Sequence, residues 1–285
     1  MENTIVNYEE RTQRLYTTYV AGGYDEASAA ISAHLNATTP LTPKHTKEQW
    51  LLPVELARSA LFRVADPSKP RIYRDKFEIP MMAPGGKGTL TYTGQELRQD
   101  DRQVFMQALF LEQETPGVAV IKPNQFLKAL GWSTNSDSRE RLLDCLTRMK
   151  ATALRIHVQR FPNALTTSLI DDFVENTATK TIQVYFKESV RRLFDNNAYA
   201  RVVRVHETEL PKKAYLARWL LCFYTTHAKP IDLSLKLLQE LCGQNTEQMP
   251  MKEFTRKMKE ALQQLQAVGF LLTHEVKDGK VHVER

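Results

Sequence analysis

Apolar residues near the end of the chain recur at the spacing of an amphipathic helix. Over residues 254–265 they recur at helical spacing and so share one face, namely Phe254, Met258, Ala261, Leu262 and Leu265. The opposite face is polar and basic and carries Lys252, Arg256, Lys259 and Gln263. This pattern predicts a helix that packs on a core and presents cations outward.

A strand pair is predicted directly after this helix. Alternating apolar residues over 268–272 indicate a strand, and the pair Asp278-Gly279, flanked by Lys277 and Lys280, favours a tight hairpin turn. A helix with a cationic front and a hairpin with a charged tip are typical of a winged helix. In that motif the helix enters the DNA major groove and the hairpin contacts the backbone. A solvated helix face on an ordinary α+β domain is the alternative for any single basic stripe.

The same order of patterns occurs twice along the chain. The first half contains DDRQVFMQALFLEQ, KPNQFLKALG, SRERLLDCLTRMKA and LRIHV. The second half contains YLARWLLCFYTTH, IDLSLKLLQELCG, FTRKMKEALQQLQ and GFLLTHEV. Each series reads as a helix, a short helix ending at Gly131 or Gly243, a long helix, and a strand that opens a strand pair. The repetition predicts an α+β fold of two tandem winged-helix domains, each a helix-turn-helix with a β-hairpin wing.

The long helix of the first half is predicted over residues 137–153, with Asp137 and Glu140 capping its start. Its apolar face is Leu142, Cys145, Leu146, Met149 and Ala153. Its outer face mixes basic residues with Glu140 and Asp144, so a solvated surface is the alternative to groove binding. The DNA contacts that we predict over both halves, with the last two on the backbone, are Arg141, Thr147, Arg148, Lys252, Arg256, Lys259, Gln263, Lys277 and Lys280.

These patterns divide the chain into an N-terminal appendage over residues 1–47, a first winged-helix domain over 48–200 and a second over 201–285. In the appendage, Asp25 is expected to cap a short helix. The apolar side of that helix is Ala27, Ala30, Ile31, His34 and Leu35. Four other residues are expected to pack on the main body or to form a docking surface for a partner or a second copy, namely Tyr8, Leu15, Tyr16 and Tyr19.

Composition favours an anionic partner. The 285 residues include 39 basic and 33 acidic ones, for a formal net charge of +6, and 42% are hydrophobic, which allows a sizeable core. Three cysteines lie far apart within apolar helical patterns and read as buried thiols of a reducing compartment, namely Cys145, Cys222 and Cys242. The sequence shows neither the roughly 18 apolar residues of a membrane span nor a signal peptide, so we expect a cytoplasmic protein.

Four blocks of the chain resemble the TrfA family of plasmid replication initiators. They are LARSALFR at residues 56–63, TGQELRQDDRQVF at 93–105, WLLCFYTTHAKP at 219–230 and KEALQQLQAVGF at 259–270. Their order and spacing also match, so the resemblance covers roughly residues 50–285. It implies a protein that binds directly repeated sites, called iterons, in double-stranded DNA at a plasmid origin.

The resemblance also implies further partners. Members of the family help to open an AT-rich segment and to recruit the host replicative helicase, in collaboration with the host initiator DnaA. They interconvert between monomers and dimers, and the monomer is the form active at the origin, which links them to plasmid copy control. Some carry the clamp-binding peptide Gln-Leu-Ser-Leu-Phe. Residues 107–111 are the nearest string here, and they read as core helix.

The residues do not favour an enzyme. A rolling-circle nickase needs a tyrosine beside two metal-binding histidines, and the seven histidines include no His-X-His pair. The glycine-rich run over residues 83–89 lacks the spacing of a phosphate-binding loop and leads into a predicted strand. His227, Asp100 and Asp101 are expected to cap helices. We therefore expect no catalytic residue, no cofactor and no metal.

The sequence thus predicts a non-enzymatic replication initiator that recognises repeats at a plasmid origin. One alternative is a winged-helix transcriptional repressor or autoregulator without a direct role in replication. Another is a module that mainly binds proteins, since winged helices also serve as interaction surfaces.

Overall fold

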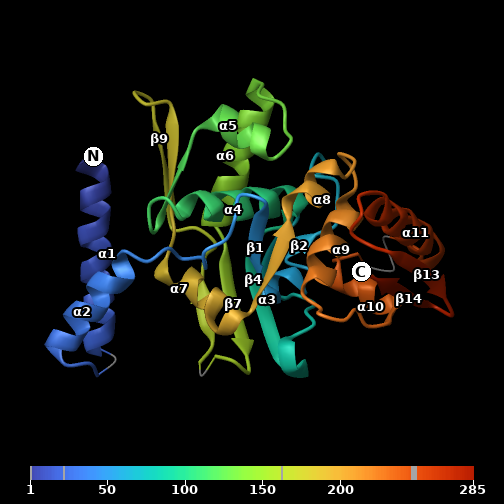
Figure 1. Ribbon diagram of the computed structural model, residues 1–285, viewed down its shortest axis with the longest axis horizontal. Helices are drawn as coiled ribbons and strands as arrows, with labels where there is room; N and C mark the ends of the chain where they lie inside the picture. Colours follow the sequence, from blue (N-terminus) through green and yellow to red (C-terminus); the bar gives the residue numbers. More distant parts are fainter. Residues whose placement is uncertain (1, 22, 162, 245–248) are drawn as a thin grey trace.

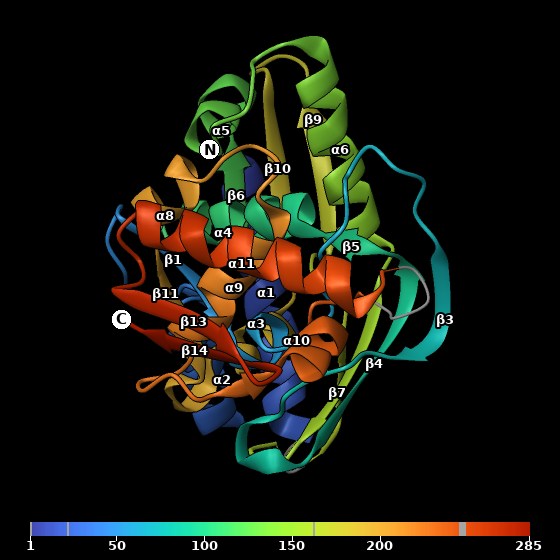
Figure 2. The ribbon, with the colours of Figure 1, turned by 90° about the vertical axis from the view of Figure 1, so that its right-hand side faces the viewer.

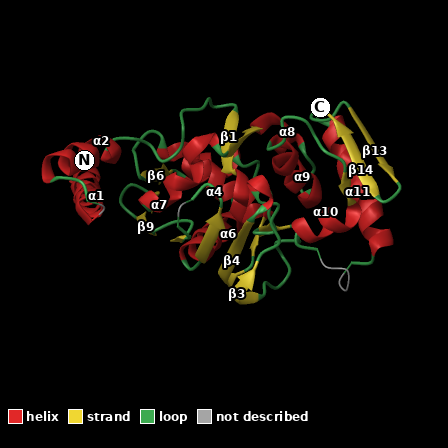
Figure 3. Cartoon of the chain, turned by 90° about the horizontal axis from the view of Figure 1, so that it is seen from below, coloured by secondary structure: helices red, strands yellow, loops and turns green. Residues whose placement is uncertain are grey.

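The computed structural model describes residues 2–21, 23–161, 163–244 and 249–285, which form a mixed α+β structure. A hairpin of two helices stands at one end of the molecule (Figure 1). The C-terminal helix and its strand pair lie at the other end, as the view from below also shows (Figure 3). The main body between them contains several small sheets covered by helices.

The N-terminal hairpin consists of α1 (Glu2–Ala21) and α2 (Glu26–Ala37). Asp25 caps α2 as predicted, because its carboxylate accepts a hydrogen bond from the Ser28 backbone N–H at 3.0 Å. The residues expected to form the apolar side of α2 are not buried. Its five residues are exposed, and Ile31 and Leu35 are 63% and 60% exposed.

Alanines form the buried side of α2 instead, namely Ala29, Ala33 and Ala37. Their small side chains let the two helices approach closely. Leu15 and three tyrosines of α1 pack on this side, namely Tyr8, Tyr16 and Tyr19. These residues therefore pack on α2, so the expectation that they pack on the main body is wrong, and a docking surface for a partner or a second copy stays a prediction.

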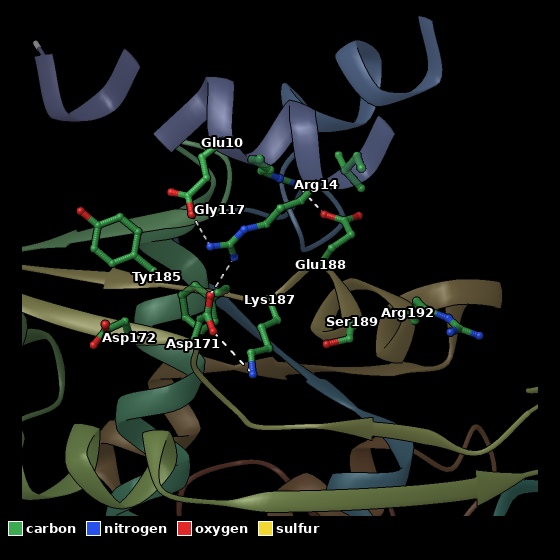
Figure 4. A pocket seen from close by; sticks show the side chains of 13 residues that line it. Glu10, Arg14, Gly117, Asp171, Asp172, Tyr185, Lys187, Glu188, Ser189 and Arg192 are labelled. Atoms are coloured by element: carbon green, nitrogen blue, oxygen red, sulfur yellow. Dashed lines mark hydrogen bonds and ion pairs between the residues drawn. The ribbon is translucent and has the colours of Figure 1, made fainter. Parts of the chain in front are cut away.

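Charged side chains join the hairpin to the main body (Figure 4). Arg11 pairs with Glu188 at 2.9 Å, and Arg14 pairs with Asp171 at 3.2 Å. A hollow of about 740 Å³ lies between α1 and the body beside these pairs and is also lined by Tyr185. The hairpin has its own small core, separate from that of the main body.

Two units of the main body repeat the same order of elements. The first unit comprises α4 (Gln99–Glu112), β6 (Val118–Ile121), α5 (Pro123–Ala129), α6 (Ser136–Lys150), β9 (Asp172–Asn176) and β10 (Thr181–Tyr185). The second unit comprises α9 (Tyr215–Thr225), β12 (Leu233–Ser234), α10 (Leu235–Leu241), α11 (Met251–Ala267), β13 (Thr273–Lys277) and β14 (Lys280–Glu284). Their antiparallel sheets have corresponding strand orders, β6-β10-β9 and β12-β14-β13. The predicted repeat is thus present as a repeated supersecondary unit.

The short helices of the two units also end in the same way. Gly131 follows α5 and Gly243 follows α10, with φ angles of 70° and 79°. Glycine adopts this left-handed region without the steric penalty of a side chain. In both cases the backbone N–H of the next residue donates a hydrogen bond to a carbonyl of the helix. The N···O distance is 2.8 Å for Trp132 and 3.0 Å for Gln244. The two short helices therefore share the same helix-ending turn.

The strand predicted over residues 154–158 does not belong to the strand pair of the first unit, although the sequence repeat suggests that it does. It is β7 (Ala153–Val158), which lies between β4 (Gly88–Gln95) and β8 (Leu165–Thr167) in a sheet whose edge is β3 (Tyr73–Glu78). The strand pair of the first unit is β9 and β10. Alternating burial identifies β7 as a strand, but it does not determine which strand pairs with it.

The remaining elements lie before the first unit and between the two units along the chain. They are β1 (Gln49–Pro53), α3 (Val54–Ala57), β2 (Phe62–Arg63), η1 (Pro84–Gly86), β5 (Leu97–Arg98), α7 (Glu188–Arg191), η2 (Arg192–Asn197), β11 (Tyr199–Val203) and α8 (Arg204–Glu209). β1 pairs with β11, so the domain boundary expected at residue 200 falls inside a strand. One hydrophobic core contains buried residues of both units, such as Phe105 and Phe223.

The three cysteines are buried free thiols of this core, as predicted. Burial raises the pKa of Cys222 and of Cys242 to about 12. Both thiols are therefore protonated and unreactive at neutral pH.

His227 caps the end of α9, as the sequence predicts. Its Nδ1 lies 3.0 Å from the Phe223 carbonyl oxygen, to which it donates, and its buried Nε2 has no described partner. Burial, together with the charges of Arg58 and Arg285, lowers the pKa of His227 from 6.5 to about 4. A proton on Nε2 would be buried without an acceptor, so the folded protein keeps this imidazole neutral.

Acid is therefore expected to destabilise the protein through His227. The unfolded chain binds the proton first as pH falls from 6.5 towards 4, which lowers the free energy of unfolding by about 1–3 kcal/mol. Urea unfolding of the protein and of a His227→Gln variant at pH 7 and pH 5 measures this contribution. The variant should lose less stability on acidification, and parallel losses would contradict the assignment.

Candidate nucleic-acid interface

α11 has the two faces that its sequence predicts. All five apolar residues are buried, namely Phe254, Met258, Ala261, Leu262 and Leu265. The predicted contact residues of the opposite face are exposed, namely Lys252, Arg256, Lys259 and Gln263. α11 crosses the outer surface of the second unit beside its strand pair (Figure 2). These side chains are therefore accessible to a ligand as large as a DNA duplex.

Two ion pairs along α11 involve acids one turn away. Arg256 lies 3.5 Å from Glu260, with side chains 66% and 57% exposed, and Lys257 lies 3.1 Å from Glu253. Exposed pairs at this spacing contribute only about 0.3–0.5 kcal/mol. A phosphate can therefore replace Glu260 as the partner of Arg256 at little cost.

The tip of the adjacent hairpin carries the two predicted lysines. Asp278 and Gly279 connect β13 to β14 with φ angles of 51° and 71°. Two consecutive positive values are typical of the type I′ turn that matches strand twist. Lys277 and Lys280 face each other at this end of the strand pair, and both are exposed.

The segment between α11 and β13 differs from the prediction. Val268, expected to start a strand, ends α11 instead. Gly269 follows with a φ angle of 72°, and the Phe270 backbone N–H bonds to the Leu265 carbonyl at 3.0 Å. This helix-ending turn delays the strand until Thr273.

α6, the long helix of the first unit, begins differently from the prediction. Asn135 caps it by accepting a hydrogen bond from the Ser138 backbone N–H at 3.1 Å. The expected pair of Asp137 and Glu140 is therefore not the cap, because the last extended residue lies before Ser136. The buried face is as predicted over Leu142, Cys145, Leu146 and Met149. Ala153 lies beyond the helix end, in β7, and is exposed.

The three predicted DNA contacts of α6 have different surroundings. Thr147 is exposed. The Arg141 side chain is 40% exposed and lies 4.0 Å from the Trp132 ring centre and 3.3 Å from Asp100. The Arg148 side chain is only 11% exposed and pairs with Asp101 at 2.9 Å. The charge of Arg148 thus already has an internal partner.

A buried charge cluster next to α6 was missed by the sequence analysis. Asp100 and Asp101 open α4 as predicted, and Asp101 accepts from the Arg98 backbone N–H at 2.7 Å. Both carboxylates also pair with Arg71, at 2.9 and 2.7 Å. Burial raises the pKa of Asp100, but the charges of Arg71 and Arg141 outweigh it and lower that pKa. Partners about 30 residues apart leave no periodic signal in a sequence.

Within the described residues, no group of three His, Cys, Asp or Glu side chains could hold a metal ion. The chain after the glycine-rich run forms β4, not a helix whose N-terminus could bind phosphate. The helices that the structure describes include none long and apolar enough to cross a membrane. That the protein is not an enzyme stays a prediction.

Two similar units, one with an accessible cationic helix beside a charged hairpin tip, are features expected of a protein that binds duplex DNA. The chain belongs to the TrfA family, since the profile described as TrfA protein matches residues 35–285. This match confirms the resemblance of the four sequence blocks. It also begins earlier than residue 50, inside α2.

Individual relatives agree with this assignment. The chain is 29% identical over 269 residues to the plasmid replication initiator protein TrfA of Escherichia coli, an alignment that covers 85% of this chain and 68% of that protein. Two crystal structures of domains 2 and 3 of RctB share the mixed α+β fold, with TM-scores of 0.52 and 0.51 and identities of 13% and 11%. They cover 82% and 78% of this chain and 98% and 95% of their own chains. Homology to a plasmid initiator supports a role in replication initiation.

Proposed function

We propose that this protein is a plasmid replication initiator that binds double-stranded DNA through two winged-helix units. α11 and α6 would enter successive major grooves, while the tips of β13–β14 and β9–β10 contact the backbone. The corresponding sheet orders of the two units support this assignment. The observation that carries it is the exposed face of α11, where three cations lie opposite a fully buried apolar face.

The two long helices would contribute unequally. On α11, Lys252, Arg256 and Lys259 supply phosphate or base contacts. On α6, Thr147 and Arg141 remain available, and Arg148 positions the helix through its pair with Asp101. The second unit therefore provides most of the electrostatic affinity.

Family membership supports the rest of the proposed role. The DNA sites would be iterons at a plasmid origin, and binding would help to open an adjacent AT-rich segment. The host helicase and DnaA would be the protein partners, with an equilibrium between dimer and active monomer. In this mechanism the protein acts by binding, without catalysis.

An Arg256→Ala variant tests the contact that α11 makes. Its affinity for the cognate repeat is expected to fall by about 1–3 kcal/mol, because a bidentate contact to guanine or a phosphate contact is lost. Fluorescence anisotropy with a labelled repeat duplex measures the change. Arg192→Ala is the matched control, since Arg192 is exposed and directly follows α7, a helix that lies at a distance from α11 (Figure 1). Unchanged affinity of the Arg256 variant would remove α11 from the groove.

A further inference from the structure

A loop over residues 65–70 lies between the two long helices (Figure 2). On one side it borders a hollow of about 750 Å³ that is also lined by Arg141 of α6. On the other side it borders a hollow of about 420 Å³ that is also lined by Arg256 of α11. Asp66 and Lys213 line both hollows. The loop and Lys213 therefore connect the two surfaces that are proposed to contact DNA.

This loop is held in place by two guanidinium groups. Arg98 donates hydrogen bonds to the carbonyls of Asp66, Lys69 and Pro70, at 2.8 Å for Lys69 and 2.7 Å for Pro70. Arg71, directly after the loop, is fixed by its ion pairs with the carboxylates at the start of α4. Prolines at 67 and 70 further restrict the backbone. These contacts restrict the loop before a ligand binds, which reduces the entropy lost on binding.

Two exposed lysines stand on this bridge, Lys69 in the loop and Lys213 before α9. Asp66 is an acid whose charge interacts with both lysines. Its carboxylate accepts hydrogen bonds from the Ser68 backbone N–H at 3.0 Å and from the Ser68 hydroxyl at 2.8 Å. These bonds lower the pKa of Asp66 more than the two lysines do. Asp66 is therefore ionised and its single negative charge acts on both lysines, which leaves the group with a net positive charge that can attract a phosphate.

The acids on the two rims are Asp100 and Asp144 on the α6 side and Glu260 on the α11 side. Asp100 is paired with Arg71 and Arg141, and Glu260 with Arg256. Lys257, which pairs with Glu253, also lines the second hollow. A backbone strand that passes from one long helix to the other would meet Lys69 and Lys213 between them.

We propose that Lys69 and Lys213 form a third DNA contact, a phosphate clamp on the duplex segment between the two half-contacts of the long helices. This inference rests on the proposed function. The clamp contacts the backbone alone, so it adds affinity without sequence preference. Its rigid position also fixes the distance between the two half-contacts on the repeat.

The test is a Lys69→Ala, Lys213→Ala double variant bound to the repeat duplex over a salt series. Loss of two phosphate contacts is expected to reduce the slope of log affinity against log salt by about 2. The affinity should fall about tenfold or more near 0.15 M salt, with unchanged preference for the repeat over a scrambled duplex. A Lys44→Ala, Lys87→Ala double variant is the control, since both lysines are exposed and line neither hollow.

The outcomes separate the inference from the proposed function. If the double variant keeps the slope and affinity of the unsubstituted protein while Arg256→Ala weakens binding, the clamp is wrong and the role of α11 stands. If the variant binds less tightly but loses preference for the repeat, the clamp is also wrong, because the lysines then read bases. If the unsubstituted protein does not prefer the repeat, the proposed function itself fails.

Discussion

A Glu207→Ala variant is expected to unfold with a free energy about 3–5 kcal/mol lower than that of the unsubstituted protein. Glu207 is fully buried, and its Oε1 lies 2.8 Å from Arg102 and 3.0 Å from Arg218. Burial alone raises the pKa of Glu207, but the two guanidinium groups outweigh it and lower that pKa. Removing the carboxylate leaves two buried cations without their counter-charge, which is the main origin of the expected loss.

Urea unfolding at pH 7 measures this loss. Glu209→Ala is the matched control, because Glu209 lies in the same helix and is exposed. Replacing Arg102, Glu207 and Arg218 together by apolar residues of similar volume should recover most of the stability, since no unpaired charge then remains. A loss below about 1 kcal/mol for Glu207→Ala would contradict a structural role for the triad.

This triad matters for DNA binding because of where its members lie. Arg102 is in α4 of the first unit, Arg218 is in α9 of the second, and Glu207 is in α8 between them. The triad therefore links the two units in one relative orientation. Two half-contacts with a fixed separation can select repeats of a defined length, which two freely linked units cannot do as sharply.

The second large effect is expected on DNA binding. A Lys252→Glu, Arg256→Glu, Lys259→Glu triple variant should bind the repeat about 4 kcal/mol or more less tightly, which is roughly a thousandfold. Three attractive contacts with phosphates or bases become repulsive, and the salt slope should fall by about 3. Electrophoretic mobility shift and anisotropy at several salt concentrations measure both quantities.

Folding of this triple variant is expected to be unaffected. All three side chains are exposed, and none belongs to the buried face of α11. Its melting temperature should therefore match that of the unsubstituted protein. Lys44→Glu together with Lys87→Glu is the control, since it makes two such charge reversals at exposed positions outside α11. Retention of tight, repeat-specific binding by the triple variant would contradict the placement of α11 in the groove.

Periodicity predicted those features that depend on neighbours along the chain. The buried and exposed faces of α11, the tight turn at Asp278, the cap at Asp25 and the cap by His227 are local, and the structure confirms them. The repeated unit also followed from the order of patterns, because the same local elements recur.

The errors concern partners that are distant in sequence. β7 has the alternation of a wing strand, but it pairs with β4, 60 to 70 residues earlier in the chain. α2 buries alanines because α1 approaches closely, although Ile31 and Leu35 are the larger hydrophobic residues. The charge of Arg148 is taken by Asp101, 47 residues away. Such choices depend on tertiary contacts, which local pattern does not encode.

The most direct measurement is binding of the purified protein to a duplex that carries the tandem repeats beside its own gene. A scrambled duplex of the same length and base composition is compared over a salt series. The repeats are expected to bind at least about a thousandfold more tightly, with an affinity that falls linearly with salt on logarithmic axes. Equal affinity for the two duplexes would leave only a basic surface and would contradict recognition of an origin.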